Sequence, residues 1–180
     1  MIRAIVILAL LLPLAPRTAA AQAQTPLELS GGYSAVNDPN DQVSLPLGWM
    51  AGGGLMLTGW LSAVADVSGN HTTVAAFGSD LRLGVFAAMG GLRASARLGR
   101  FTEFGQLLTG VVRSSSTAFG LTSTTDALGL QPGAGIDYPL GGPFAARAEL
   151  DVRFIHNQGE GNSSGHEYRF VAAIVYRRPR

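Results

Sequence analysis

Four charged side chains alternate with apolar ones over residues 144–155, which run F-A-A-R-A-E-L-D-V-R-F-I. The charged residues occupy every second position: Arg147, Glu149, Asp151 and Arg153. Guanidinium and carboxylate groups at this spacing can pair with each other, line a path for ions or exchange protons. Because successive side chains of a strand point to opposite faces, the range predicts a β-strand with an ionic face and an apolar face.

The other candidates for chemistry are three histidines and two polar clusters. His71, His156 and His166 fall in or beside predicted loops without a known metal-ligand spacing, so we expect solvated histidines, no metal and no cofactor. Residues 37–41, N-D-P-N-D, lack the glycine and distal glutamate of an EF-hand loop and predict a turn. Ser114–Ser116 supply hydroxyl groups, but the sequence has no G-x-S-x-G motif, so we expect no catalytic residue and no enzyme.

The start of the chain predicts export. Arg3 is followed by an apolar run, Ile5–Leu14, and then by small residues, which is the pattern of a signal peptide over residues 1–23 cleaved after Ala21 or Ala23. The apolar run is shorter than the ~20 residues that a membrane-spanning helix needs. Since the 180-residue chain contains no cysteine, disulfides cannot stabilise the exported domain.

The composition favours a membrane environment. Hydrophobic residues make up 47% of the chain and charged residues only 14%, which is little charge for a soluble exported protein. The net charge of +1 argues against nucleic acid as a partner.

Eight segments of strand length show the same alternation as residues 144–155. They are Leu27–Val36, Leu45–Leu57, Trp60–Ser68, Val85–Ala96, Phe101–Arg113, Asp126–Tyr138, Phe144–Ile155 and Glu167–Arg177. Such strands can cross a bilayer when tilted, because ~9–11 residues suffice. The breaks between them alternate between long and short: 37–44, 58–59, 69–84, 98–100, 114–125, 139–143 and 157–166. We therefore expect an all-β, eight-stranded antiparallel up-and-down transmembrane β-barrel over residues 25–177, with a short basic tail at 178–180.

Two positions conflict with a regular barrel. Pro132 falls inside a predicted strand and has no N–H for the ladder, so we expect a bulge, a local break or a shorter strand there. In the segment Phe101–Arg113, either Gln106 or Glu103 must face lipid. We expect Gln106 inside, because Glu103 and Arg113 then lie near the two rims, where charge costs little.

Aromatic residues of the apolar parity fall at two heights along the predicted strands. Those towards the long loops are Tyr33, Trp49, Phe86, Phe154 and Tyr168. Those towards the short turns are Phe101, Tyr138, Phe144 and Tyr176. Two girdles at two membrane interfaces produce this distribution.

Several segments resemble the recurrent strands of small outer-membrane β-barrels, the family of OmpA-like, OmpX-like and opacity-type domains. They are L-E-L-S-G-G-Y at 27–33, A-D-V-S-G-N at 65–70, M-G-G-L-R-A-S-A at 89–96, F-G-Q-L-L-T-G-V at 104–111 and G-A-G-I-D-Y at 133–138. The resemblance covers roughly residues 25–177 and implies a stand-alone barrel in the bacterial outer membrane, inserted by the barrel-assembly machinery. The chain differs from the family at the C-terminus: members commonly end on an aromatic residue, whereas here R-R-P-R follows the last aromatic residue, Tyr176.

Ten charged residues share the parity that a membrane barrel turns inward. They are Glu28, Asp66, Arg93, Asp137, Arg147, Glu149, Asp151, Arg153, Glu167 and Arg169. Eight strands enclose a space that side chains fill, so charges of both signs there are expected to pair as an ionic plug. A gated polar channel is the alternative for the same residues.

The expected function is structural, or surface interaction through loops 69–84 and 114–125, the longest of the four outer loops. The expected partners are outer-membrane lipid and an extracellular ligand, with both termini in the periplasm. Three alternatives remain: a narrow pore for ions or small solutes, an enzyme that modifies lipid A, and a soluble lipocalin-type barrel with its apolar face inside.

Overall fold

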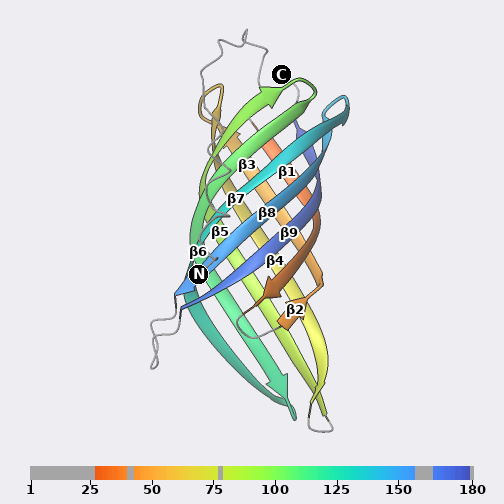
Figure 1. The fold of residues 1–180 in the computed structure, drawn as a ribbon, viewed down its shortest axis with the longest axis vertical. Helices are drawn as coiled ribbons and strands as arrows, with labels where there is room; N and C mark the ends of the chain where they lie inside the picture. The colour runs from red at the N-terminus through yellow and green to blue at the C-terminus, as the bar shows by residue number, and fades with distance from the viewer. Residues whose placement is uncertain (1–26, 40–42, 77–78, 157–163, 179–180) are drawn as a thin grey trace, which may run out of the picture.

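A computed structural model describes residues 27–39, 43–76, 79–156 and 164–178 of the chain, and the predicted signal peptide lies outside them. All regular structure in this part is strand (Figure 1): β1 (Leu27–Asp38), β2 (Val43–Leu45), β3 (Leu47–Met56), β4 (Leu61–Ala76), β5 (Ser79–Leu98), β6 (Phe101–Ala118), β7 (Leu121–Gly141), β8 (Phe144–His156) and β9 (Ser164–Arg177). Among these residues no helix is long and apolar enough to cross a membrane.

The strands form a closed antiparallel barrel. β1 pairs with β3, each strand from β3 to β8 pairs with the next one in the sequence, and β1 also pairs with β9 from Glu28↔Arg177 to Asn37↔Tyr168. Short β2 and longer β3 both pair with β1 and are separated by Pro46, so they act as one wall strand. The predicted eight-stranded up-and-down barrel is confirmed.

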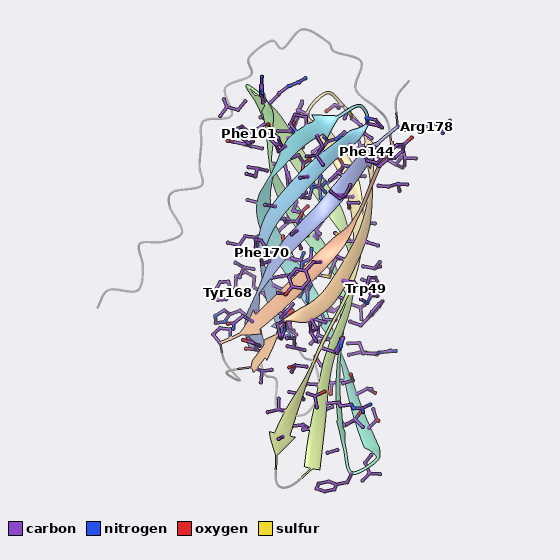
Figure 2. The ribbon with its side chains drawn as sticks, turned by 90° about the vertical axis from the view of Figure 1, so that its right-hand side faces the viewer. Trp49, Phe101, Phe144, Tyr168, Phe170 and Arg178 are labelled. Carbon is purple, nitrogen blue, oxygen red and sulfur yellow. The ribbon has the colours of Figure 1, made fainter. Side chains whose placement is uncertain are left out.

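Four strands continue past the rest of the wall at one end. β4 and β5 pair as far as Ala76↔Ser79, and β6 and β7 as far as Ala118↔Leu121, so a four-stranded sheet projects beyond the barrel (Figures 1 and 2). The prediction that 69–84 and 114–125 are loops was therefore wrong. Phe119 and Gly120 have φ of 51° and 78°, the positive pair that a two-residue hairpin turn requires.

The opposite end of the barrel carries the short turns. The predicted two-residue turn at 58–59 spans Leu57–Trp60 instead, because the Thr58 hydroxyl accepts a hydrogen bond from the Leu61 amide at 3.1 Å. The described ends of the chain lie here too, since the Arg178 amide donates to the Leu27 carbonyl at 3.1 Å.

Pro132 interrupts one ladder without ending its strand. β7 pairs with β6 through Leu107↔Pro132, whereas its pairing with β8 skips from Leu130↔Phe154 to Gly133↔Asp151 in unchanged register. The missing N–H of Pro132 accounts for a gap on one side only. The expected irregularity is thus a local break in the ladder, and the bulge of this strand pair lies at Pro139/Gly141.

The outer surface of the barrel is apolar. Leu107, Leu130, Leu150 and Ile174 are each close to half exposed, as are many other large hydrophobic side chains of the same parity. The aromatic rings lie at two levels: Phe101 and Phe144 towards the short turns, Trp49 and Tyr168 towards the projecting sheet (Figure 2). At the level of the short turns, Phe101 contacts Tyr138 and Phe144 contacts Tyr176, at 5.4 and 5.6 Å between ring centroids.

Candidate functional site

The inner face of the barrel carries the charged residues. Strand alternation turns all ten side chains that were singled out by parity inward: Glu28, Asp66, Arg93, Asp137, Arg147, Glu149, Asp151, Arg153, Glu167 and Arg169. Each is in an ion pair with another member of the set. The structure adds Arg177, which has the same parity and whose role the sequence reasoning missed.

Arg169 is the centre of the network on the side of the projecting sheet. It is fully buried and lies 2.7 Å from Asp66, 2.8 Å from Asp151 and 3.1 Å from Glu149. Asp151 and Glu149 belong to the neighbouring strand β8, whereas Asp66 belongs to β4, so one guanidinium links adjacent strands and also strands on opposite sides of the lumen. The planar, five-donor guanidinium suits this role, because a single head group can bind several carboxylates at once.

Glu28 is the corresponding centre towards the short turns. Its carboxylate lies 2.8 Å from Arg93, 2.7 Å from Arg147 and 3.1 Å from Arg177. Asp137 pairs with Arg147 at 2.7 Å and also with Arg177. The last strand therefore bonds to the first through side chains as well as through the backbone ladder.

Two arginines of this cluster contact the same aromatic ring. The guanidinium carbons of Arg93 and Arg147 are 4.4 and 4.7 Å from the ring centroid of buried Phe104. Such cation–π contacts offset part of the cost of placing two like charges close together. Gly135 makes room for the ring, since a Cβ there would come within 2.5 Å of it.

Two glutamines complete the polar contacts. Gln106 accepts hydrogen bonds from Arg93 and donates to Glu149 at 2.9 Å, linking the two clusters. Gln106 lies inside the barrel, as we expected from the sequence of the segment Phe101–Arg113. Gln131 accepts a 2.8 Å hydrogen bond from Arg153, which also pairs with Glu167.

The lumen is not ionic throughout. A buried apolar cluster occupies the inner face of β4, β5 and β6 and consists of Val64, Ala87, Met89, Leu108 and Val112. A smaller one joins Met50, Val171 and Ala173. The sequence reasoning missed this division, although all these residues have the inward parity. The inside of the barrel is thus a packed core in which apolar clusters lie among the charged residues: Val64 shares β4 with Asp66, and Val171 shares β9 with Arg169.

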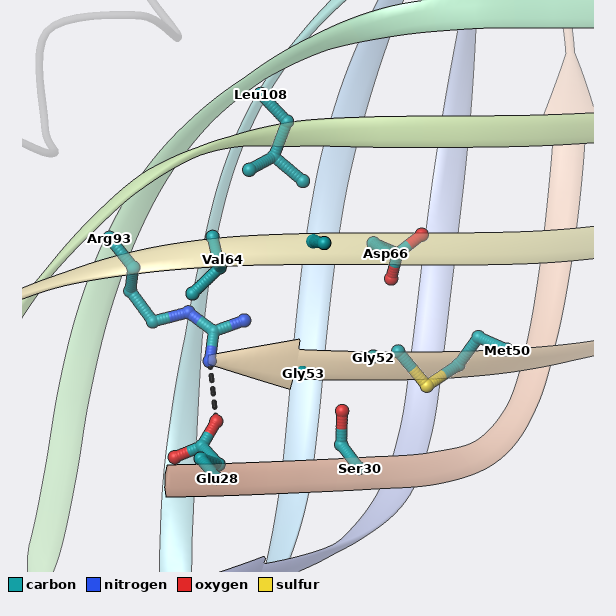
Figure 3. Close-up of a pocket in the computed structure, with 10 residues that line it drawn as sticks. Glu28, Ser30, Met50, Gly52, Gly53, Val64, Asp66, Arg93 and Leu108 are labelled. Carbon is teal, nitrogen blue, oxygen red and sulfur yellow. Dashed lines mark hydrogen bonds and ion pairs between the residues drawn. The ribbon is translucent and has the colours of Figure 1, made fainter. Parts of the chain in front are cut away.

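Little open space remains among the side chains of the lumen. A cavity of about 10 Å³ lies among Glu28, Ser30, Met50, Asp66 and Arg93 (Figure 3). That volume holds at most a single water molecule.

The remaining candidates do not come together. Ser114 and Ser116 have the inward parity of β6, whereas His156 at the end of β8 has the outward one. Ser115 also points outward, but His156 lies level with Leu128 of β7 and Val111 of β6, four residues along the strand from Ser115. Among the described residues, no three histidine or acidic side chains are placed to hold a metal ion.

Comparisons with known proteins find structural likeness only. No family model matches the chain, and no curated protein is similar in sequence. Neisserial surface protein A (NspA) has a TM-score of 0.62 at 13% identity, covering 84% of this chain and 96% of its own. Ail, the attachment invasion locus protein of Yersinia pestis, has a TM-score of 0.58 at 10% identity, covering 88% and 100%. OprG of Pseudomonas aeruginosa has a TM-score of 0.55 at 12% identity, covering 87% and 98%. The chain has the fold of the small eight-stranded outer-membrane barrels.

Proposed function

We propose that this chain is an integral protein of the bacterial outer membrane, with a plugged barrel as scaffold and projecting hairpins as its interaction surface. The observation that carries the proposal is the reversed distribution of side chains. Arg153, Arg169 and Asp151 are fully buried inside the barrel, while leucine, isoleucine and aromatic side chains at the outward positions are exposed around the wall. Only a hydrocarbon solvent makes such a surface favourable.

The orientation follows from the two ends of the barrel. Outer-membrane barrels have short periplasmic turns and longer extracellular segments. The turns at Leu57–Trp60, Gly99–Arg100 and Gly142–Pro143 therefore face the periplasm in this proposal, together with both ends of the described chain. The projecting sheet of β4–β7 faces the outside.

The projecting sheet is the best place for a surface partner. Phe119 and Leu121 at its tip are exposed by 75% and 78%, more than the other large hydrophobic side chains of the described chain. Exposed apolar groups on a hairpin held by a rigid barrel are typical of binding surfaces. Ail, whose name refers to attachment and invasion, supports the same class of role by analogy of fold alone. The partner during insertion would be the barrel-assembly machinery.

Fractionation of cells tests the location. We expect the protein in the outer-membrane fraction, with migration in SDS gels that changes on heating because the closed barrel resists the detergent. A soluble periplasmic protein that migrates identically before and after boiling would contradict the proposal and favour the lipocalin-type alternative.

Conductance in planar bilayers tests the plug. We expect no ion current through the wild-type barrel, because ion pairs and apolar side chains fill its lumen. A current that disappears in Arg147→Ala or Arg153→Ala would support the narrow pore instead. The proposal assigns no catalytic activity, and loss of a lipid A modification on deletion of the gene would overturn that part.

A further inference from the structure

A shallow groove of about 250 Å³ lies on the outward face where the barrel meets the projecting sheet. Its floor is backbone, because Gly69 and Gly84 occupy the outward positions of β4 and β5 there. The aromatic walls are Trp49 and Phe86, and Arg113 completes the rim. Figure 2 shows Trp49 at this junction, just before the four strands leave the barrel.

The groove lies at the level of the outer aromatic girdle. Backbone pairing places Tyr33, Trp49, Gly69, Phe86 and Arg113 in one row across five neighbouring strands. Amphipathic rings mark the boundary between hydrocarbon and head groups. The groove therefore opens at the depth of the lipid head groups.

The outward side chains of the wall change from apolar to polar at this row. Two positions nearer the barrel centre, the outward row is apolar and runs Val67, Ala88, Val111 and Leu128. Two and four positions beyond it, the outward side chains are polar or cationic: His71, Ser115, Thr124, Thr73, Arg82, Thr117 and Thr122. Hydrocarbon chains fit the first surface, and a polar, negatively charged head group fits the second.

The cations on this face are placed to bind an anion. Asp126 holds Arg113 through two hydrogen bonds, Nε to Oδ1 at 2.6 Å and Nη2 to Oδ2 at 2.7 Å, which leaves Nη1 directed away from its partner. Arg82 is exposed on the same face of β5, four residues beyond Phe86, which is the backbone partner of Arg113. From the girdle row outward, the described outward side chains of β4–β7 include two arginines, Arg82 and Arg113, one histidine, His71, and one carboxylate, Asp126.

We propose that this groove binds a lipid of the outer leaflet whose head group is a phosphorylated sugar. Arg113 and Arg82 would hold the phosphate through charge-assisted hydrogen bonds, the Ser and Thr hydroxyls would bind the sugar, and the acyl chains would lie along the Val67–Leu128 row. Trp49 and Phe86 would enclose the link between sugar and chains. This site lies outside the barrel and is independent of the ionic network in the lumen.

Binding to vesicles tests the proposal. The Trp60→Phe protein, whose single remaining tryptophan is Trp49, is inserted into phosphatidylcholine vesicles containing either diphosphorylated lipid A or the same lipid with its phosphates removed. Trp49 fluorescence and native mass spectrometry report the bound lipid. We expect the phosphorylated form to bind at least about tenfold more tightly.

Two variants locate the site. In Arg82→Gln/Arg113→Gln, the affinity for phosphorylated lipid A should fall about tenfold, whereas Arg100→Gln/Arg178→Gln, with the same charge change at the opposite rim, should keep it. Gly84→Val keeps the cations but fills the groove, and it should also weaken binding. Heat-modifiable migration of each variant separates a failure to insert from a failure to bind lipid.

Three results would overturn the proposal. The first is equal affinity for phosphorylated and dephosphorylated lipid A. The second is an equal loss in the control pair at the opposite rim, which would indicate unspecific attraction. The third is full affinity in folded Gly84→Val, which would place the lipid elsewhere on the barrel.

Discussion

All thirteen cationic residues of this chain are arginines, and the sequence contains no lysine. In the lumen this choice has a structural reason. Arg169 binds three carboxylates and Arg147 two, in each case through more than one nitrogen atom of the guanidinium group. An ammonium group has no such planar fork and is more strongly hydrated, so lysine would lose more on transfer to this interior.

Arg169→Met tests the contribution of one buried guanidinium. Methionine fills much of the same volume but leaves Asp66, Glu149 and Asp151 without their shared cation. We expect the free energy of unfolding to fall by about 3–5 kcal/mol, measured by urea denaturation of the barrel in vesicles. Arg100→Met, in an exposed turn, is the matched control and should cause no measurable change. Equal stability of both variants would show that the pairs are not structural.

Two glycines of neighbouring strands differ in what a methyl group would meet. A Cβ at Gly133 would lie 1.7 Å from the Asp151 carboxylate, whereas a Cβ at Gly105 would find no atom nearer than 4.0 Å. Gly133→Ala should therefore displace Asp151 from Arg169 and lower stability by about 1–3 kcal/mol. Gly105→Ala should be neutral in the same urea titration, and a neutral Gly133→Ala would contradict the packing described here.

At the scale of elements, alternation predicted the barrel well and the ends of its strands poorly. Every strand expected from the sequence exists, because a one-residue shift in register would exchange the charged and apolar faces of a wall strand. Beyond the barrel this constraint disappears. The Ser/Thr-rich stretch 114–125 carries no apolar alternation, so it resembled a loop, yet its β-branched residues continue β6 and β7 as a hairpin.

The ionic network of the lumen, like the barrel, was only partly predictable from the sequence. Parity alone identified the ten inward charges, because in each strand they alternate with apolar residues. The pairs that cross the lumen were not predictable, since Arg169 and Asp66 are 103 residues apart and meet only in the closed barrel. Phe104 was also missed, because an aromatic ring of inward parity has no sequence signal that marks it as a partner of arginine.

Removal of the β6–β7 hairpin tests whether the projecting sheet contributes to the barrel. Ser114 and Thr125 pair directly, so residues 115–124 can be replaced by Asn-Gly, which closes a two-residue hairpin at that point. The lumen network and the Arg113–Asp126 pair remain intact. We expect the same heat-modifiable migration and the same urea midpoint as in the wild type. Loss of the folded form would show that the sheet is part of the structural core.

At the scale of the whole molecule, closure joins the two ends of the chain. The seam between β1 and β9 combines ten pairs of backbone partners with the side-chain pair between Arg177 and Glu28. A closed sheet has no edge strand, and in lipid every open edge would leave backbone groups without hydrogen bonds. Closure should therefore be all or none.

Two adjacent glycines of β1 allow a direct test of closure. A Cβ at Gly32 would lie 2.2 Å from the Ala172 carbonyl oxygen and 2.5 Å from the Ala173 Cα, so β9 could not approach. A Cβ at Gly31 points outward and meets only the Met50 carbonyl oxygen, at 3.8 Å. Gly32→Val should abolish the heat-modifiable band, because backbone atoms at the seam cannot move aside as a side chain can. Gly31→Val adds the same group one residue away and should leave the band unchanged. A folded Gly32→Val barrel with wild-type migration would mean that the strands at the seam lie farther apart than in this structure.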